Sequence, residues 1–145
     1  FFPPPDGIRD PLWSRGLGDV YKRQVTKVLP SEGTLPKFEI TAQGSGTITG
    51  VPVQFMGTYQ TEMRADGSMY GECPNSSLLM AADGVATLKA SGVGRTEPDG
   101  STKFRGIFYI ETTAPSLMSL NGKAIVQEYD VDAEGNATCE MWHWA

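Results

Sequence analysis

The chain is poor in the residues that carry most nucleophilic and metal chemistry. Its 145 residues include one histidine, His143, and two cysteines, Cys73 and Cys139. A Ser-His-Asp or Cys-His pair would have to use His143, which alternates with Cys139 and Met141 along one strand face. Two cysteines and one histidine also leave a tetrahedral zinc site one ligand short unless a carboxylate joins them. We therefore expect no metal and no cofactor, and we interpret His143 as a strand-surface or interface residue.

Cysteine is too scarce to imply a disulfide framework. Cys73 and Cys139 could form one bridge in an oxidising compartment or remain two reduced, partly buried thiols. No secretory signal is visible, which favours reduced thiols and a cytoplasmic location. The chain starts without an initiator Met, so a signal peptide upstream stays an open alternative.

Positive charge is also scarce, with 12 Lys and Arg against 17 Asp and Glu and a net charge of −5. Nucleic acids and anionic membrane surfaces require a concentrated basic patch, and the sequence contains no basic run. No apolar stretch approaches the roughly 20 residues of a membrane-spanning helix. We expect neither a nucleic-acid partner nor a membrane-bound protein.

The first 24 residues carry no strand or helix pattern. Pro3-Pro4-Pro5 cannot enter a sheet interior. The stretch DPLWSRGLGDVYKRQ, residues 10–24, resembles translated sequencing-adapter read-through. We expect residues 1–24 to be non-native or a disordered N-terminal segment, and residues 25–145 to form a single β-barrel domain. Deletion of residues 1–24 should then lower the thermal midpoint by less than about 5 °C.

What the chain has in plenty is glycine in turn positions. Segments of alternating apolar and polar residues are separated by Asp66-Gly67, Asp83-Gly84, Asp99-Gly100, Asn121-Gly122 and Glu134-Gly135-Asn136. Such pairs accept the positive φ of two-residue hairpin turns, so the spacing predicts an antiparallel meander.

The predicted strands cover residues 25–29, 38–49, 51–60, 69–72 with 78–82, 85–95, 102–113, 123–131 and 137–144. Cys73-Pro74-Asn75-Ser76 must break or bulge its strand. Residues 114–120 can form a helical turn with Leu117 and Leu120 inward. A sheet of about eight strands would expose its edges, so we predict closure into an antiparallel up-and-down barrel. Glycines within strands suit its tightly coiled corners. A two-sheet sandwich is the alternative, but it needs longer connections.

Several segments also carry a family resemblance. KFEITAQGSGTITGVPV, GTYQTEMRADGSMYGE, GVGR, FRGIFY, LNG and EYDVDAEGNATCEMWHW resemble, over residues 25–145, a bacterial family of hypothetical proteins. That family is similar in shape to allene-oxide-cyclase-like and calycin barrels. The resemblance implies the same barrel but transfers no catalytic residue. Cys73-Pro74 and His143 depart from it, since a Gly-rich stretch and an acidic residue are expected there.

A calcium-loop pattern begins at Asp130 and has glycine at its sixth position, Gly135. The twelfth position is Met141, where a calcium loop needs a bidentate carboxylate, and strand patterns rather than helices flank the segment. We interpret it as a hairpin turn.

Polar residues within otherwise apolar strands are the better candidates for a site. Arg105 and Glu128 could form a buried pair in a pocket, or they could be cross-strand charges on the outside, which the sequence favours. A barrel of eight strands either fills with side chains or holds one small ligand. The leading hypothesis is binding of a small, largely apolar molecule. Its expected lining is Tyr59, Phe104, Arg105, Phe108, Glu128, Tyr129, Trp142 and Trp144.

Two other functions remain open. The cyclase-like shape implies a cofactor-free cyclase or isomerase that would use Glu128 or Tyr129 as acid or base. A filled barrel would instead be a structural or assembly module. The closing strand has Trp142 and Trp144 on one face and Cys139 and Met141 on the other. Because a barrel buries one face only, we also expect a homodimer or trimer.

Overall fold

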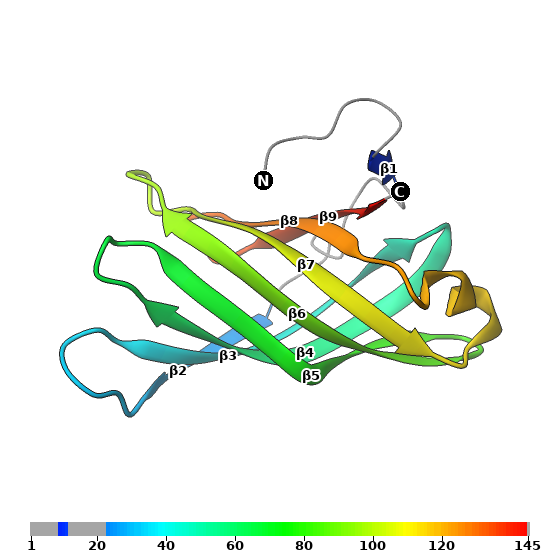
Figure 1. The fold of residues 1–145 in the computed structure, drawn as a ribbon, viewed down its shortest axis with the longest axis horizontal. Coiled ribbons are helices and arrows are strands. Elements are labelled where there is room, and N and C mark those ends of the chain that lie inside the picture. The colour runs from blue at the N-terminus through cyan, green and yellow to red at the C-terminus, as the bar shows by residue number, and fades with distance from the viewer. Residues whose placement is uncertain (1–8, 12–22, 145) are drawn as a thin grey trace.

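The computed structural model describes residues 9–11 and 23–144, which form one antiparallel sheet (Figure 1). Its strands are β1 (Arg9–Pro11), β2 (Arg23–Leu29), β3 (Lys37–Ile48), β4 (Val51–Met63), β5 (Met69–Ala81), β6 (Gly84–Thr96), β7 (Thr102–Thr112), β8 (Ile125–Val131) and β9 (Ala137–Trp144). From β2 to β9 each strand pairs with its neighbour in the sequence, and β1 joins the outer edge of β9. The predicted all-β, up-and-down architecture is therefore confirmed.

The predicted closure of the barrel is not confirmed. Among the described strands, β2 pairs with β3 alone, and no ladder joins it to β9. The outer edge of β9 pairs with β1 at Trp142, His143 and Trp144. The backbone groups of that stretch are thus engaged by β1 and are not available to β2. The domain boundary expected after residue 24 falls inside β2. Strand β1 belongs to residues 1–24, which the sequence placed outside the domain. Of that segment, residues 1–8 and 12–22 lie outside the described residues.

The open sheet nevertheless curls around an interior. In Figure 1, β3 and β4 lie across from β8 and β9. Tyr59 of β4 meets Tyr129 of β8 edge to face, with 6.3 Å between ring centroids. Ala42 of β3 and Ala137 of β9 are fully buried in one small cluster. Among the described residues, contacts between side chains, rather than backbone hydrogen bonds, bring the two margins of the sheet together.

One end of this interior is densely packed. The 3-10 helix η1 (Pro115–Leu120) covers it and buries Leu117 and Leu120 completely, as the inward spacing of these leucines predicted. They join one core cluster with residues such as Ile48, Leu79 and Ile125. We call this region the packed end.

Side chains fix η1 at both of its ends. The Asp83 carboxylate accepts hydrogen bonds from the Ser116 amide (2.8 Å) and hydroxyl (2.7 Å), which hold the pKa of Asp83 below its usual range. Asn121 Oδ1 accepts from the Thr112 amide, and Asn121 Nδ2 donates to the Thr112 carbonyl. The Asn121 amide thereby acts as a strand partner for the end of β7.

The glycine turns have the positive φ that was predicted, but most are longer than two residues. Gly67, Gly100 and Gly135 have φ of 86°, 88° and 90°. The loops at 64–68, 97–101 and 132–136 share two backbone hydrogen bonds. The amide of the first residue donates to the carbonyl of the fifth, and the glycine amide donates to the carbonyl of the first. This is the three-residue hairpin in which a type I turn is followed by a left-handed residue. Asp132 Oδ1 accepts the amides of Glu134 and Asn136, so the suspected calcium loop is a hairpin turn.

The two-residue turns occur elsewhere. Thr49 and Gly50 both have positive φ (50° and 78°) between the paired residues Ile48 and Val51, as a type I′ turn requires. The other is formed by residues 82–83, which places Gly84 at the start of β6 with φ 155°. Gly122 has φ 76° but follows η1 rather than joining two strands of a hairpin.

Candidate functional site

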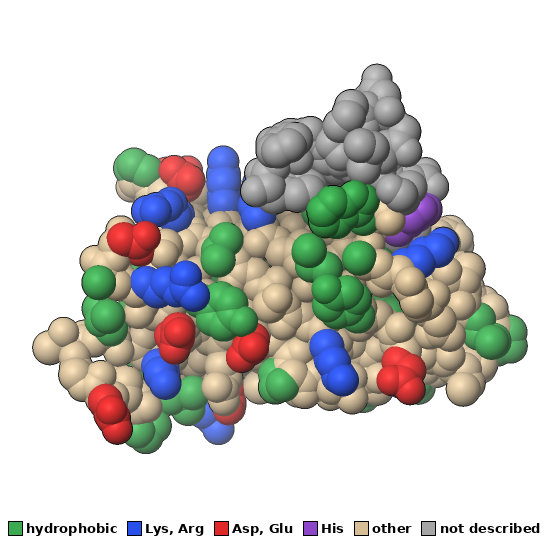
Figure 2. Space-filling view, in the orientation of Figure 1, with side chains coloured by type: hydrophobic (Ala, Val, Ile, Leu, Met, Phe, Trp, Pro, Cys, Tyr) green, Lys and Arg blue, Asp and Glu red, His purple; other side chains and the backbone are tan. Residues whose placement is uncertain are grey.

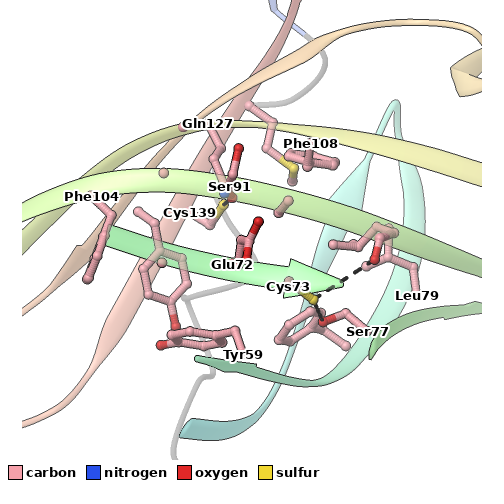
Figure 3. Close-up of a pocket in the computed structure, with 18 residues that line it drawn as sticks. Tyr59, Glu72, Cys73, Ser77, Leu79, Ser91, Phe104, Phe108, Gln127 and Cys139 are labelled. Atoms are coloured by element: carbon pink, nitrogen blue, oxygen red, sulfur yellow. Dashed lines mark hydrogen bonds between the residues drawn. The ribbon is translucent and has the colours of Figure 1, made fainter. Parts of the chain in front are cut away.

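A cavity of about 100 Å³ lies inside the curled sheet, next to the packed end (Figure 3). Its lining comes from β4 to β9 and consists mainly of apolar and aromatic side chains. Strand alternation places these side chains on the inner face, so the sheet itself forms both floor and walls.

The floor is a row of three glycines on adjacent strands. Gly71 of β5 is the register partner of Gly92 of β6, which in turn is the partner of Gly106 of β7. We call these residues the glycine row. A Cβ on Gly106 would come within 2.2 Å of the Ser91 carbonyl oxygen, so two of the strands approach too closely there for a side chain. The cavity exists because three neighbouring inward positions have no side chain to fill it.

Aromatic rings stand on either side of the glycine row. Phe104 of β7 lies two residues before Gly106 and is the register partner of Tyr129 of β8. Phe108 lies two residues after Gly106 and is the register partner of Ala90 of β6. A Cβ on Gly94 would come within 2.6 Å of the Phe104 ring, which shows how closely this ring lies over the sheet. The cavity is therefore a slot above backbone and between aromatic walls.

Tyr59 and Tyr129 bring polar atoms to the aromatic wall. Gln24 Nε2 donates a hydrogen bond to the Tyr59 hydroxyl at 3.0 Å. Burial raises the pKa of Tyr59, while hydrogen bonds from Tyr129 and Gln24 oppose the shift. Tyr59 therefore stays protonated at neutral pH.

Gln127 stands at the end of the glycine row, where it is the register partner of Gly106. Cys139 Sγ donates to Gln127 Oε1 at 3.7 Å. Burial raises the pKa of the Cys139 thiol to about 12, with a smaller contribution from Asp130 and Glu140. The thiol is thus protonated at physiological pH and can serve as the donor that orients the amide.

The wall nearest the packed end includes a bulge in β5, as the sequence predicted. The register of β5 shifts against both neighbours between Cys73 and Ser77. Cys73 Sγ lies 2.9 Å from Ser77 Oγ, and both side chains are buried. A Cβ on Gly57 would come within 2.0 Å of Ser77 Oγ, so Gly57 makes room for this pair. Cys73 and Cys139 are both free thiols, as expected.

Carboxylates do not point into the described part of the cavity. Glu72 is the one carboxylate residue among the lining residues, but its side chain is exposed and accepts a hydrogen bond from Tyr70 at 3.1 Å. Within residues 9–11 and 23–144, no three His, Cys, Asp or Glu side chains gather as a metal site. Among the described lining residues, the titratable side chains that face the cavity are the two tyrosines and the thiols of Cys73 and Cys139.

The structure separates the eight expected lining residues into two groups. Tyr59, Phe104, Phe108 and Tyr129 lie together in the cavity wall. The side chains of Arg105, Glu128, Trp142 and Trp144 alternate with inward residues and face outward.

On the outer face, Arg105 is paired with Asp130 at 2.7 Å rather than buried with Glu128. Glu128 lies opposite Arg105 in register, as the cross-strand alternative anticipated. Figure 2 shows charges of both signs interspersed with hydrophobic side chains over the coloured residues of this view.

Sequence reasoning missed the glycine row and Gln127. The available signal was the recurrence of glycine at inward positions of three successive strands, which was interpreted as barrel corners alone. Gln127 could have been found from strand alternation. It lies on the same face of β8 as Tyr129, two residues away, and on the other face from its neighbour Glu128, which points outward.

Fold and site together define an all-β, up-and-down antiparallel protein with a small internal cavity. In the described residues no helix is both long and apolar enough to span a bilayer. No family model and no curated protein matches the chain. Among solved structures it is similar to a conserved protein of unknown function from Rhodopseudomonas palustris, with a TM-score of 0.73, 14% identity, and coverage of 93% of this chain and 95% of that one. At this identity the likeness shows a shared fold alone.

Proposed function

We propose that the protein binds a small, largely apolar molecule in the cavity above the glycine row. The observation that carries this proposal is an apolar space kept open where three adjacent inward positions lack side chains. Close-packed interiors leave few voids larger than a water molecule, so an aromatic-walled slot of about 100 Å³ is unusual for a purely structural core. The same space argues against a fully filled assembly module.

Gly71 offers the sharpest test. A Cβ at Gly71 would make ordinary contacts of 3.6–3.8 Å, whereas Gly92 and Gly106 have no such room. Gly71→Leu should therefore fill the cavity without forcing the strands apart. Titration with α-methylstyrene, followed by ¹H–¹⁵N shifts of Gly92 and Gly106, should show saturable binding to the wild type and none to Gly71→Leu. Tyr70→Leu, on the outer face of the same strand, is the matched control and should bind as the wild type does.

A cofactor-free cyclase or isomerase remains the second candidate because two tyrosines meet at the cavity wall. Glu128, the acid or base suggested by the sequence, faces outward, so Tyr59 and Tyr129 would have to supply the proton. Conversion of a bound unsaturated probe, followed by NMR and lost in Tyr59→Phe, would support catalysis. A probe recovered unchanged after prolonged incubation would support binding.

Self-association is a separate proposal based on the outer face. Ile107, Val126 and Trp142 are register neighbours across β7, β8 and β9, but Val126 is only 7% exposed. The exposed apolar side chains of this outer face are Val93 (50%) and Tyr109 (54%), and exposed apolar side chains on the outside of a sheet favour contact with a second copy. Sedimentation velocity at micromolar concentration should show a dimer or trimer, whereas a clean monomer would contradict the proposal.

A further inference from the structure

The cavity is smaller than most ligand sites and has few polar groups. Its volume of about 100 Å³ is well below the 300–1,000 Å³, roughly, of drug-sized pockets. An engineered apolar cavity of about 150 Å³ in another protein accommodates benzene. The space above the glycine row is smaller than that cavity, so it suits no molecule larger than about one ring.

The floor favours a flat molecule. Gly71, Gly92 and Gly106 present backbone alone over three strands, a strip about 10 Å wide at normal strand spacing. Phe104 and Phe108 bound this strip two positions away on either side. A planar ring can lie against the strip or slide between the walls, whereas a bulky aliphatic group meets aromatic rings on both sides.

Most polar side chains that line the cavity already have partners. Cys73 and Ser77 bond with each other, and Tyr59 accepts from Gln24. Gln127 differs, because Cys139 engages its Oε1 atom while its Nε2 atom forms no hydrogen bond with any described residue. An amide nitrogen has two N–H donors, so this end of the slot can donate to a ligand.

We infer that the cavity selects a planar single-ring compound bearing one carbonyl-type acceptor, which Gln127 Nε2 binds while the ring lies over the glycine row. The Cys139 thiol fixes the direction of the amide by donating to Oε1. Gln127 is therefore the specificity-determining residue, and the glycine row determines shape. This inference rests on the proposed binding function.

The experiment compares acetophenone with α-methylstyrene, which have the same shape but carry C=O and C=CH₂ respectively. The two probes differ in hydration, so the decisive quantity is the ratio of their dissociation constants in each protein variant. Gln127→Leu removes the donor and retains similar bulk. It should weaken acetophenone binding by roughly three- to tenfold, the value of one hydrogen bond, and leave α-methylstyrene binding unchanged.

Each outcome is decisive. If Gln127→Leu changes the binding of both probes equally, or changes neither, the role of Gln127 is overturned. The proposed binding function still stands in that case, provided that the wild type binds saturably and Gly71→Leu abolishes the binding. Failure of both probes to bind the wild type would overturn the binding function and this inference together. If Gln127→Leu does not fold, as judged by circular dichroism, Gln127→Met removes the same donor with an unbranched chain and is measured in its place.

Discussion

The inner face of the sheet has two regions of opposite character. At the packed end, large side chains from β3 to β9 meet Leu117 and Leu120 of η1, and little space remains. At the glycine row β5, β6 and β7 each contribute a residue without a side chain, and the cavity opens. One curled sheet thus has a region that stabilises the fold and a separate region that leaves space for a ligand. Branched side chains at one end hold the fold together, and their absence a few residues away leaves room for a ligand.

The largest effect should come from the packed end. Leu117→Ala removes a fully buried side chain and should lower the free energy of unfolding by about 2–5 kcal/mol. Met118→Ala, in the same helix but 51% exposed, should change it by less than about 0.5 kcal/mol. Urea denaturation of both variants gives the comparison. Equal losses would mean that η1 does not carry the core.

The cavity region should be the more sensitive to alkali. The Cys139 pKa is raised from 9.0 to about 12, so the unfolded chain loses this proton near pH 9 while the folded chain keeps it. Stability from this group is complete below pH 9 and should fall by about 1.4 kcal/mol per pH unit between pH 9 and 12. The denaturation free energy of Cys139→Ser, measured over the same range, should lack this slope. Parallel slopes would be inconsistent with a buried thiol.

The junction between the packed end and its turn should respond next. Gly84 has φ 155°, and a Cβ there would lie 2.9 Å from the Ala114 Cβ. Gly122 has φ 76° with nothing within 4 Å. Gly84→Val and Gly122→Val should each cost about 1 kcal/mol or more. Because Gly84→Val adds a clash to the strain, its thermal midpoint should fall further, and neutral results at both sites would contradict the assigned turns.

The smallest effect should come from the glycine row. Gly71→Ala adds a methyl group that meets its neighbours at ordinary distances. Alanine also restricts the unfolded chain, so stability should stay equal or rise by about 0.4–1 kcal/mol. A loss above about 1 kcal/mol in thermal denaturation would show that the row is glycine for reasons of fold rather than space.

Sequence patterning predicted the elements better than their faces. The alternation in residues 51–60 placed Tyr59 inward correctly. The turn glycines located the hairpins that contain Gly67, Gly100 and Gly135 and the one next to Gly84, but not those at Thr49-Gly50 and between β2 and β3. Strands β7 to β9 have apolar residues at outward as well as inward positions, with Ile107, Val126 and Trp142 outside among charged residues. Alternation alone then fails to distinguish inside from outside, which is why Trp142 and Trp144 were assigned to the cavity.

Two features depend on contacts that no local pattern contains. Whether the sheet closes depends on which segment occupies the edge of β9, and β1 is too short for periodicity to reveal. The cavity depends on the register of Gly71, Gly92 and Gly106, which the bulge between Cys73 and Ser77 shifts relative to the start of β6. The bulge adds two residues to β5, so the pairing of β5 with β6 cannot be predicted by counting residues from the turn that joins them.

The sequential order of β2 to β9 also has a kinetic consequence. Each ladder in this series forms between strands that follow each other in the chain, so folding can spread from any hairpin by addition of the next strand. The β1–β9 ladder is different, because it joins opposite ends of the chain and requires the rest of the sheet to bring them together. A two-phase refolding trace is therefore expected, in which β1 docks after the meander has formed.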